Sequence, residues 1–81
     1  MTGNASHVHG SDLDSARRVK RLVIERFASA QWWRGAGLAP VDRGWAVRLD
    51  VARPVEEPLP DEVDGVPVEV HVVGDVTPLG G

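Results

Sequence analysis

Two histidines near the start of the chain have the spacing of a metal-binding pair. His7 and His9 would project to the same side of an extended segment, and Asp12 or Asp14 could supply a third ligand. Structural zinc sites use a complete set of spaced ligands, whereas this chain has no cysteine and no second ligand pair. Residues 1–10 are small and polar, which is typical of a mobile, disordered tail. We therefore expect no metal site and no cofactor.

Positive charge is concentrated in one short segment of the first half. Basic side chains recur there with helical spacing, at Arg17, Arg18, Lys20, Arg21 and Arg26. Such a face could contact nucleic-acid phosphates, and Trp32 or Trp33 could stack on a base. The chain is acidic as a whole, with a formal net charge of −3, and it carries no nucleic-acid recognition signature. Nucleic-acid binding is therefore the alternative function, since a basic helix face is usually a solvated surface.

The adjacent tryptophans Trp32 and Trp33 could anchor a protein partner. Neighbouring residues on a helix point about 100° apart, so both rings do not fit easily into one core. One ring is expected to pack beneath the sheet with Trp45, and the other to lie at the surface as an interface anchor. The alternative is that the fold covers both rings, with Arg34 stacked on one of them.

Charged side chains alternate along two predicted strands and should share the outer face of the sheet. These side chains are Arg48, Asp50, Glu69 and His71. Catalysis would need a nucleophile, a base and an orienting group within reach of each other. The hydroxyl groups are scattered, and His71 is the only histidine in a predicted element. We expect no enzyme activity, and we interpret these residues, with Trp32 and Trp33, as a partner-binding surface.

The composition fits one small globular domain. The chain has 81 residues, of which 42% are hydrophobic and 26% charged, and the core of a domain this small is modest. No apolar run is long enough to cross a membrane, and the N-terminal residues lack the features of a signal peptide, so a cytoplasmic protein is expected. Residues 1–34 carry a net +3 and residues 35–81 a net −6. This division favours a polar partner surface, or packing of a basic element beside an acidic one.

A helix is predicted from about residue 12 to about residue 32. Apolar residues recur there every three or four positions, at Leu13, Ala16, Val19, Val23, Phe27 and Ala30. Ser11 is the predicted N-cap, and Asp12 and Asp14 would lie in the first turn, where the helix dipole favours negative charge. Gly35 and Gly37 are expected to end the helix.

The second half of the chain has the period of β-strands. Apolar positions alternate with others along residues 45–52 and 66–73. A short strand at residues 37–41 would precede them, joined by a turn that ends at Gly44, and its proline places that strand at a sheet edge. Residues 53–65 contain three prolines and five acidic residues and are predicted to form a surface loop.

These elements predict an α+β domain with one long amphipathic helix packed on a small three-stranded sheet. The order would be helix, strand, strand, loop, strand, with residues 11–76 as the domain and residues 1–10 and 77–81 as tails. The helix should cover the valine face of the sheet, which would bury Val19, Val23, Phe27, Val47, Leu49, Val68 and Val70 together. Replacing Phe27 with alanine should then cost about 3–5 kcal/mol.

Residues 35–76 combine a glycine-rich entry, a turn, the strand WAVRLDV and the segment LPDEVDGVPVEVHVVG. The matching positions of that segment are Leu59, Pro60, Val63, Gly65, Val66, Pro67, Val68, Val70 and Gly74. This pattern resembles a small domain that precedes the protease domain in some bacterial trypsin-like peptidases. The resemblance implies a structural module and carries no catalytic residue. No protease domain is expected to follow, because the chain ends at Gly81.

The sequence therefore predicts a non-catalytic protein-binding or regulatory module. Its partner would be another protein or a second copy of the chain, and no membrane partner is expected. Residues 66–73 could form an exposed sheet edge, and homodimerisation by edge pairing is then the simplest outcome. Alternatively this strand lies in the centre of the sheet, where it would be unavailable to a partner.

Overall fold

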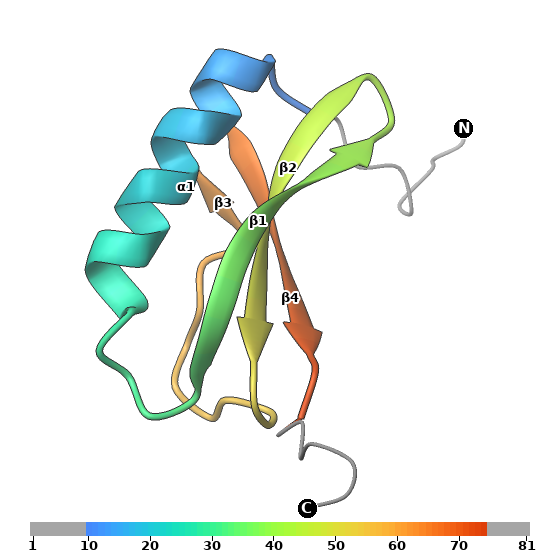
Figure 1. The fold of residues 1–81 in the computed structure, drawn as a ribbon. Helices are drawn as coiled ribbons and strands as arrows, with labels where there is room; N and C mark the ends of the chain where they lie inside the picture. The colour runs from blue at the N-terminus through green and yellow to red at the C-terminus, as the bar shows by residue number, and fades with distance from the viewer. Residues whose placement is uncertain (1–9, 75–81) are drawn as a thin grey trace, which may run out of the picture.

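One helix packs against a four-stranded mixed sheet in the computed structural model, which describes residues 10–74 (Figure 1). The elements are α1 Leu13–Phe27, β1 Trp33–Val41, β2 Gly44–Val51, β3 Glu62–Val63 and β4 Val66–Val72. The expected α+β class is confirmed. The sheet has four strands rather than three, because β3 forms inside the segment that was expected to be a loop.

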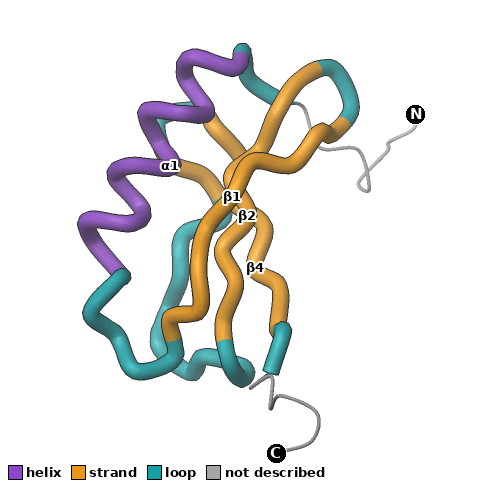
Figure 2. Tube along the Cα trace, in the orientation of Figure 1, coloured by secondary structure: helices purple, strands orange, loops and turns teal. Residues whose placement is uncertain are grey.

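The strands lie in the order β1-β2-β4-β3. β1 pairs antiparallel with β2 through a tight turn, and β2 pairs parallel with β4. Parallel neighbours need a crossover, which residues 52–61 provide as the long loop drawn in teal in Figure 2. Val55 and Leu59 of this loop pack against the core. β1 lies at one border of the sheet, as Pro40 predicts.

The turn between β3 and β4 explains why a strand as short as β3 forms at all. Asp64 and Gly65 occupy the turn with φ values of 50° and 80°. Two-residue hairpin turns with positive φ at both central positions favour the sequence Asp-Gly. The turn therefore brings Glu62 and Val63 back against the start of β4, where they pair with Pro67 and Val66 respectively.

The helix is shorter than its apolar periodicity predicts. Asp12 rather than Ser11 is the N-cap, since its carboxylate accepts hydrogen bonds from the Ser15 backbone N–H at 3.0 Å and from the Ser15 hydroxyl at 2.8 Å. At the other end α1 stops at Phe27 without a glycine. The chain reverses there because Trp32 returns to the core, with its ring 5.6 Å from that of Phe27.

The segment before the helix is tied to the sheet by a close backbone approach. Ser11 and Trp45 of β2 exchange backbone hydrogen bonds, each at 2.9 Å. A Cβ atom at Gly10 would lie 2.4 Å from the Trp45 nitrogen, so only glycine fits at this position. Gly10, which was expected to belong to the tail, is thus held in the fold. Residues 1–9 and 75–81 lie outside the described residues.

The core lies between α1 and the middle of the sheet and is apolar. Its buried residues include Ala16, Val19, Val23, Val47, Leu49, Val51, Val66 and Val68. Phe27 is only partly buried against this cluster, so its truncation should cost less than full burial implies. The expectation that Val70 is buried is wrong: 42% of it is exposed. The reason is that α1 packs across β1 and β2 and barely reaches β4.

Candidate functional site

The sheet face that points away from α1 carries the charged side chains expected from the sequence. Arg48 and Asp50 of β2 lie in register with Glu69 and His71 of β4. The Arg48 Nε atom lies 3.0 Å from Asp50 Oδ1, and the His71 Nε2 atom lies 3.4 Å from Glu69 Oε1. Each polar group is therefore matched by a neighbour two residues away on its own strand.

β1 contributes little side-chain volume to this outer face. Gly35 and Gly37 lie in register with Asp50 and Arg48 respectively. A Cβ atom at these glycines would lie 3.9 Å from Asp50 Oδ2 and 3.8 Å from Arg48 Nη2. The Arg48–Asp50 ion pair therefore lies beside β1, at ordinary contact distance from where a Cβ atom would be. Because Arg48 pairs with Asp50 and Glu69 has His71 as a polar neighbour, the face offers a partner few polar groups without a neighbour.

The tryptophans do not form the expected exposed anchor. Both lie beyond the end of α1, and Trp33 begins β1. Trp32 is only 5% exposed, and its Nε1–H donates a 2.7 Å hydrogen bond to Glu57 Oε1. Trp33 and Trp45 are partly buried against the core. The fold covers Trp32 and covers Trp33 only in part, so neither of the two predicted arrangements holds in full.

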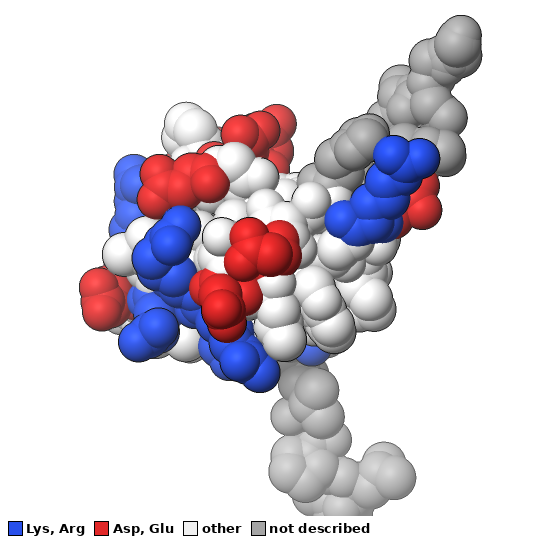
Figure 3. All heavy atoms as spheres, turned by 90° about the horizontal axis from the view of Figure 1, so that it is seen from above, with Lys and Arg blue, Asp and Glu red and all other residues white. Residues whose placement is uncertain are grey.

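The basic side chains of α1 are dispersed over its solvent side. The exposed ones are Arg17, Arg18, Arg21 and Arg26, and Lys20 is partly buried. Figure 3 shows Asp and Glu side chains among the Lys and Arg side chains on this part of the surface. The Arg26 guanidinium lies 5.3 Å from the centre of the Phe27 ring, in a cation–π contact. Trp32 is not available to stack on a base beside this face, because it is buried.

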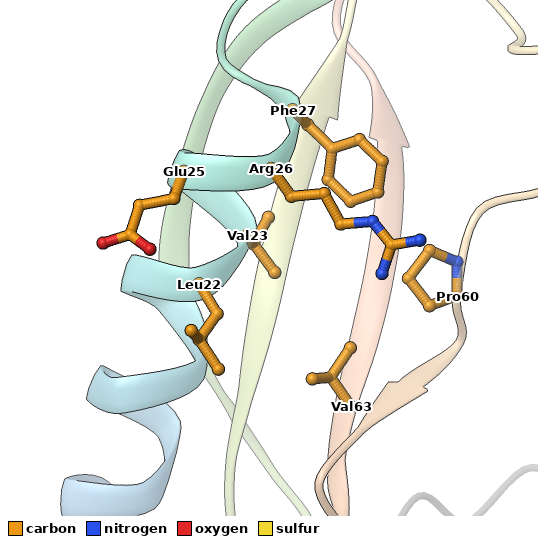
Figure 4. A pocket seen from close by; sticks show the side chains of 7 residues that line it. All are labelled: Leu22, Val23, Glu25, Arg26, Phe27, Pro60 and Val63. Atoms are coloured by element: carbon orange, nitrogen blue, oxygen red, sulfur yellow. The ribbon is translucent and has the colours of Figure 1, made fainter.

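A groove that the sequence analysis missed lies between α1 and the segment before β4. Its volume is about 380 Å³, and Figure 4 shows the lining side chains: Leu22, Val23, Glu25, Arg26, Phe27, Pro60 and Val63. Leu22 is 41% exposed, because it widens the apolar stripe of the helix beyond the part that the sheet covers. This widening is visible in the sequence, but the opposite wall depends on where β3 pairs.

The outer border of β4 is covered only at its beginning. β3 pairs with Val66 and Pro67, and the next outward N–H, that of Val68, donates to the Asp61 carbonyl at 2.9 Å. Within residues 10–74, no segment pairs with residues 69–72 on this side. The sequence analysis left open whether this strand is central or at an edge. Its start is internal, and the remainder forms a border of the sheet (Figure 1).

The hydrogen bonds of β4 show which backbone groups face this border. The Val73 N–H donates to the Val51 carbonyl of β2, whereas the Val68 N–H points to the opposite side. Successive residues of a strand direct their N–H and C=O groups to alternate sides. The N–H and C=O groups of Val70 and Val72 therefore point away from β2, toward the open side.

The side chains at this border are apolar and exposed. Val70, Val72 and Val73 are 42%, 55% and 47% exposed. The first two lie on the α1 side of the sheet, in register with Leu49 and Val51, which are fully buried. Exposed valines beside outward-facing backbone groups are the features through which an edge strand accepts another strand. We call residues 69–73 the open border.

Other kinds of site find less support in the described part of the chain. Residues 10–74 contain no group of three or more potential metal ligands, and no helix that is long and apolar enough to cross a membrane. His7 and His9 lie outside these residues. No family model matches the chain, and neither a curated protein nor a solved structure matches it. The resemblance of residues 35–76 to a domain of bacterial peptidases stays a prediction.

Proposed function

We propose that the chain is a non-catalytic protein-binding module that accepts a β-strand at the open border of β4. The observation that carries this proposal is the coincidence, at Val70 and Val72, of outward-facing backbone groups and exposed apolar side chains. An added strand would bond the N–H and C=O groups and cover the valines at the same time. In this mode the backbone hydrogen bonds supply affinity, and the alternate side chains supply specificity.

The remaining surfaces support protein binding less well. On the outer face Arg48 forms an ion pair with Asp50, and Glu69 Oε1 lies 3.4 Å from His71 Nε2. Trp32 is buried and cannot act as an anchor. The groove beside α1 is apolar, but nothing in its lining identifies an occupant. The open border combines polar groups that require partners with apolar surface that favours burial.

Selection of peptides from a displayed library of random extended sequences tests this proposal. Val72→Pro removes an outward N–H and leaves the hydrogen bonds to β2 intact, since proline is tolerated at edge positions. It should reduce the affinity for peptides selected on the unaltered chain by at least about tenfold. The control is the double variant Arg48→Ala and Asp50→Ala, which changes the outer face on β2 and should retain the peptides. Retention by Val72→Pro and loss by the double variant would place binding on the charged face instead.

A further inference from the structure

We infer that the strand which pairs with the open border is β4 of a second copy, antiparallel, in the register that sets His71 opposite His71. The inference rests on the proposed function and adds the identity and alignment of the partner. It follows from the limits of the border, from the groups that the border exposes, and from the side chains that meet across it.

Two features of the chain limit the length over which another strand can pair. The Asp61 carbonyl already accepts the hydrogen bond of the Val68 N–H at 2.9 Å, so new pairing must begin after that residue. At the other end Gly74 has φ +71°, which turns the chain out of the extended conformation. The border available to a second strand is therefore residues 69–73.

This short border is complementary to its own antiparallel image. When His71 faces His71 of the second copy, Val70 faces Val72 and Val72 faces Val70. Because these valines direct their backbone groups outward, both combinations are hydrogen-bonded pairs that exchange N–H···O bonds in both directions. Every outward N–H and C=O group of the two valines is then used. The second copy turns away at its own Gly74 before it would meet Asp61.

The neighbouring symmetric registers use these groups less completely. A two-fold axis at Val70 would set Val72 opposite Val68, whose N–H is already bonded. An axis at Val72 would set Val70 opposite Gly74, where the chain leaves the extended conformation. An axis at Glu69 would bring two carboxylates face to face, which is unfavourable in a strand pair. The register centred on His71 avoids all three problems.

The side chains in this register separate into an apolar side and a polar side. On the α1 side, Val70 and Val72 of both copies would meet in one apolar patch. On the outer side, each Glu69 would face Val73 of the other copy and the two His71 side chains would face each other, so that no carboxylates oppose each other directly. The buried border is short, and we expect a weak dimer with a dissociation constant of roughly micromolar order or above.

Single-cysteine variants test the register directly, because the chain has no cysteine of its own. In non-hydrogen-bonded antiparallel pairs the Cα atoms are about 4.5 Å apart, within the range that a disulfide spans. His71→Cys should therefore form a covalent dimer under mild oxidation at least about tenfold faster than Val70→Cys or Glu69→Cys. The fastest cross-linking at Val70→Cys would overturn the register. Equally slow cross-linking in all three folded variants would overturn the dimer.

Sedimentation velocity over a range of concentrations provides an independent test without oxidation. Val70→Lys places a charge on the open border, and Leu22→Lys is its matched control because the two side chains are 42% and 41% exposed. Val70→Lys should stay monomeric where the unaltered chain and Leu22→Lys associate. Equal association of both lysine variants, or an unaltered chain that is monomeric at millimolar concentration, would overturn the inference. In the latter case the peptide selection would still decide whether the open border binds other strands.

Discussion

The two long borders of the sheet are built differently. In β1 the outward-facing backbone groups belong to Ala36, Leu38 and Pro40, because their register partners in β2 bond on the opposite side. Pro40 has no N–H to offer, and a register shift after Trp33 disturbs the start of the strand. In β4 both outward positions of the open border are valines with intact N–H groups.

The side chains of the two borders also differ, because those of β1 are covered and those of β4 are exposed. Ala36 and Leu38 of β1 pack against the core, where α1 covers them. Val70 and Val72 of β4 lie on the same face of the sheet, but α1 does not extend over them and they remain exposed. Natural sheets usually protect their borders against unwanted pairing. A chain that protects one border and leaves apolar groups at the other indicates where an added strand would bind.

The largest expected effect is a difference in the free energy of unfolding between variants of two neighbouring residues on the α1 side of the sheet. Leu49 is 0% exposed, whereas its register partner Val70 is 42% exposed. Leu49→Ala should lower the free energy of unfolding by about 2–5 kcal/mol, and Val70→Ala by less than about 1 kcal/mol. Urea denaturation followed by tryptophan fluorescence measures both changes. Similar losses in the two variants would mean that β4 is covered as well as β2.

The next effect concerns the start of β2, where the N-terminal segment joins the sheet. A Cβ atom at Gly10 would lie 2.4 Å from the Trp45 nitrogen and 2.5 Å from the Gly44 carbonyl carbon, and backbone atoms cannot swing aside. Gly10→Ala should therefore destabilise the fold by about 1–3 kcal/mol. Gly37→Ala is the control, since its Cβ would make an ordinary contact at 3.8 Å. If the thermal midpoint of unfolding falls equally in both variants, the close backbone approach at Gly10 is not what requires glycine there.

A smaller effect should follow when the β1 border is given the group that it lacks. Pro40→Thr restores an outward N–H to β1 and should change the free energy of unfolding by less than about 1 kcal/mol. Made in the Val70→Lys background, where the open border is blocked, it should produce new self-association through β1. Sedimentation velocity would detect this association. If the double variant stays monomeric, the missing N–H is not what protects the β1 border.

The smallest effect is expected at the start of α1, far from the open border. Hydrogen bonds from the Ser15 backbone N–H and then from its hydroxyl hold the pKa of Asp12 below its usual value. Such a carboxyl stabilises the fold above its unfolded pKa, and this contribution is lost as the pH falls through the folded pKa. Asp12→Asn retains a capping oxygen but should remove that part of the acid dependence. Thermal midpoints of the two chains, compared from neutral to strongly acidic pH, should converge on acidification; parallel curves would contradict the assignment.

The helix and the longer strands could be predicted from the sequence, because in each of them the apolar residues recur with a period that places them on one buried face. A period of three or four positions located α1, and a period of two located β2 and β4. The same rule failed at Val70, which alternates in the same way as the buried Val68. Its exposure depends on where α1 lies across the sheet, and no local pattern encodes that position.

Short and reversing segments were predicted less completely. β3 has two residues, too few for any periodicity, although Asp64-Gly65 correctly indicated a turn. The early end of α1 depends on the return of Trp32 to the core, which is a tertiary effect. For the candidate site, the sequence left open whether β4 is an edge strand or a central strand. The answer depends on two tertiary features: the hydrogen bond from Val68 to Asp61, and the pairing of β3 with only the first two residues of β4.

The openness of the β4 border is tested most directly by amide hydrogen exchange in dilute protein, where self-association is negligible. An open border predicts that the Val70 and Val72 amides exchange rapidly, because they face solvent. The His71 and Val73 amides should be protected, since they face β2. Raising the protein concentration should slow exchange at Val70 and Val72 alone. Equal protection of all four amides at every dilution would contradict the open border and, with it, the proposed mode of binding.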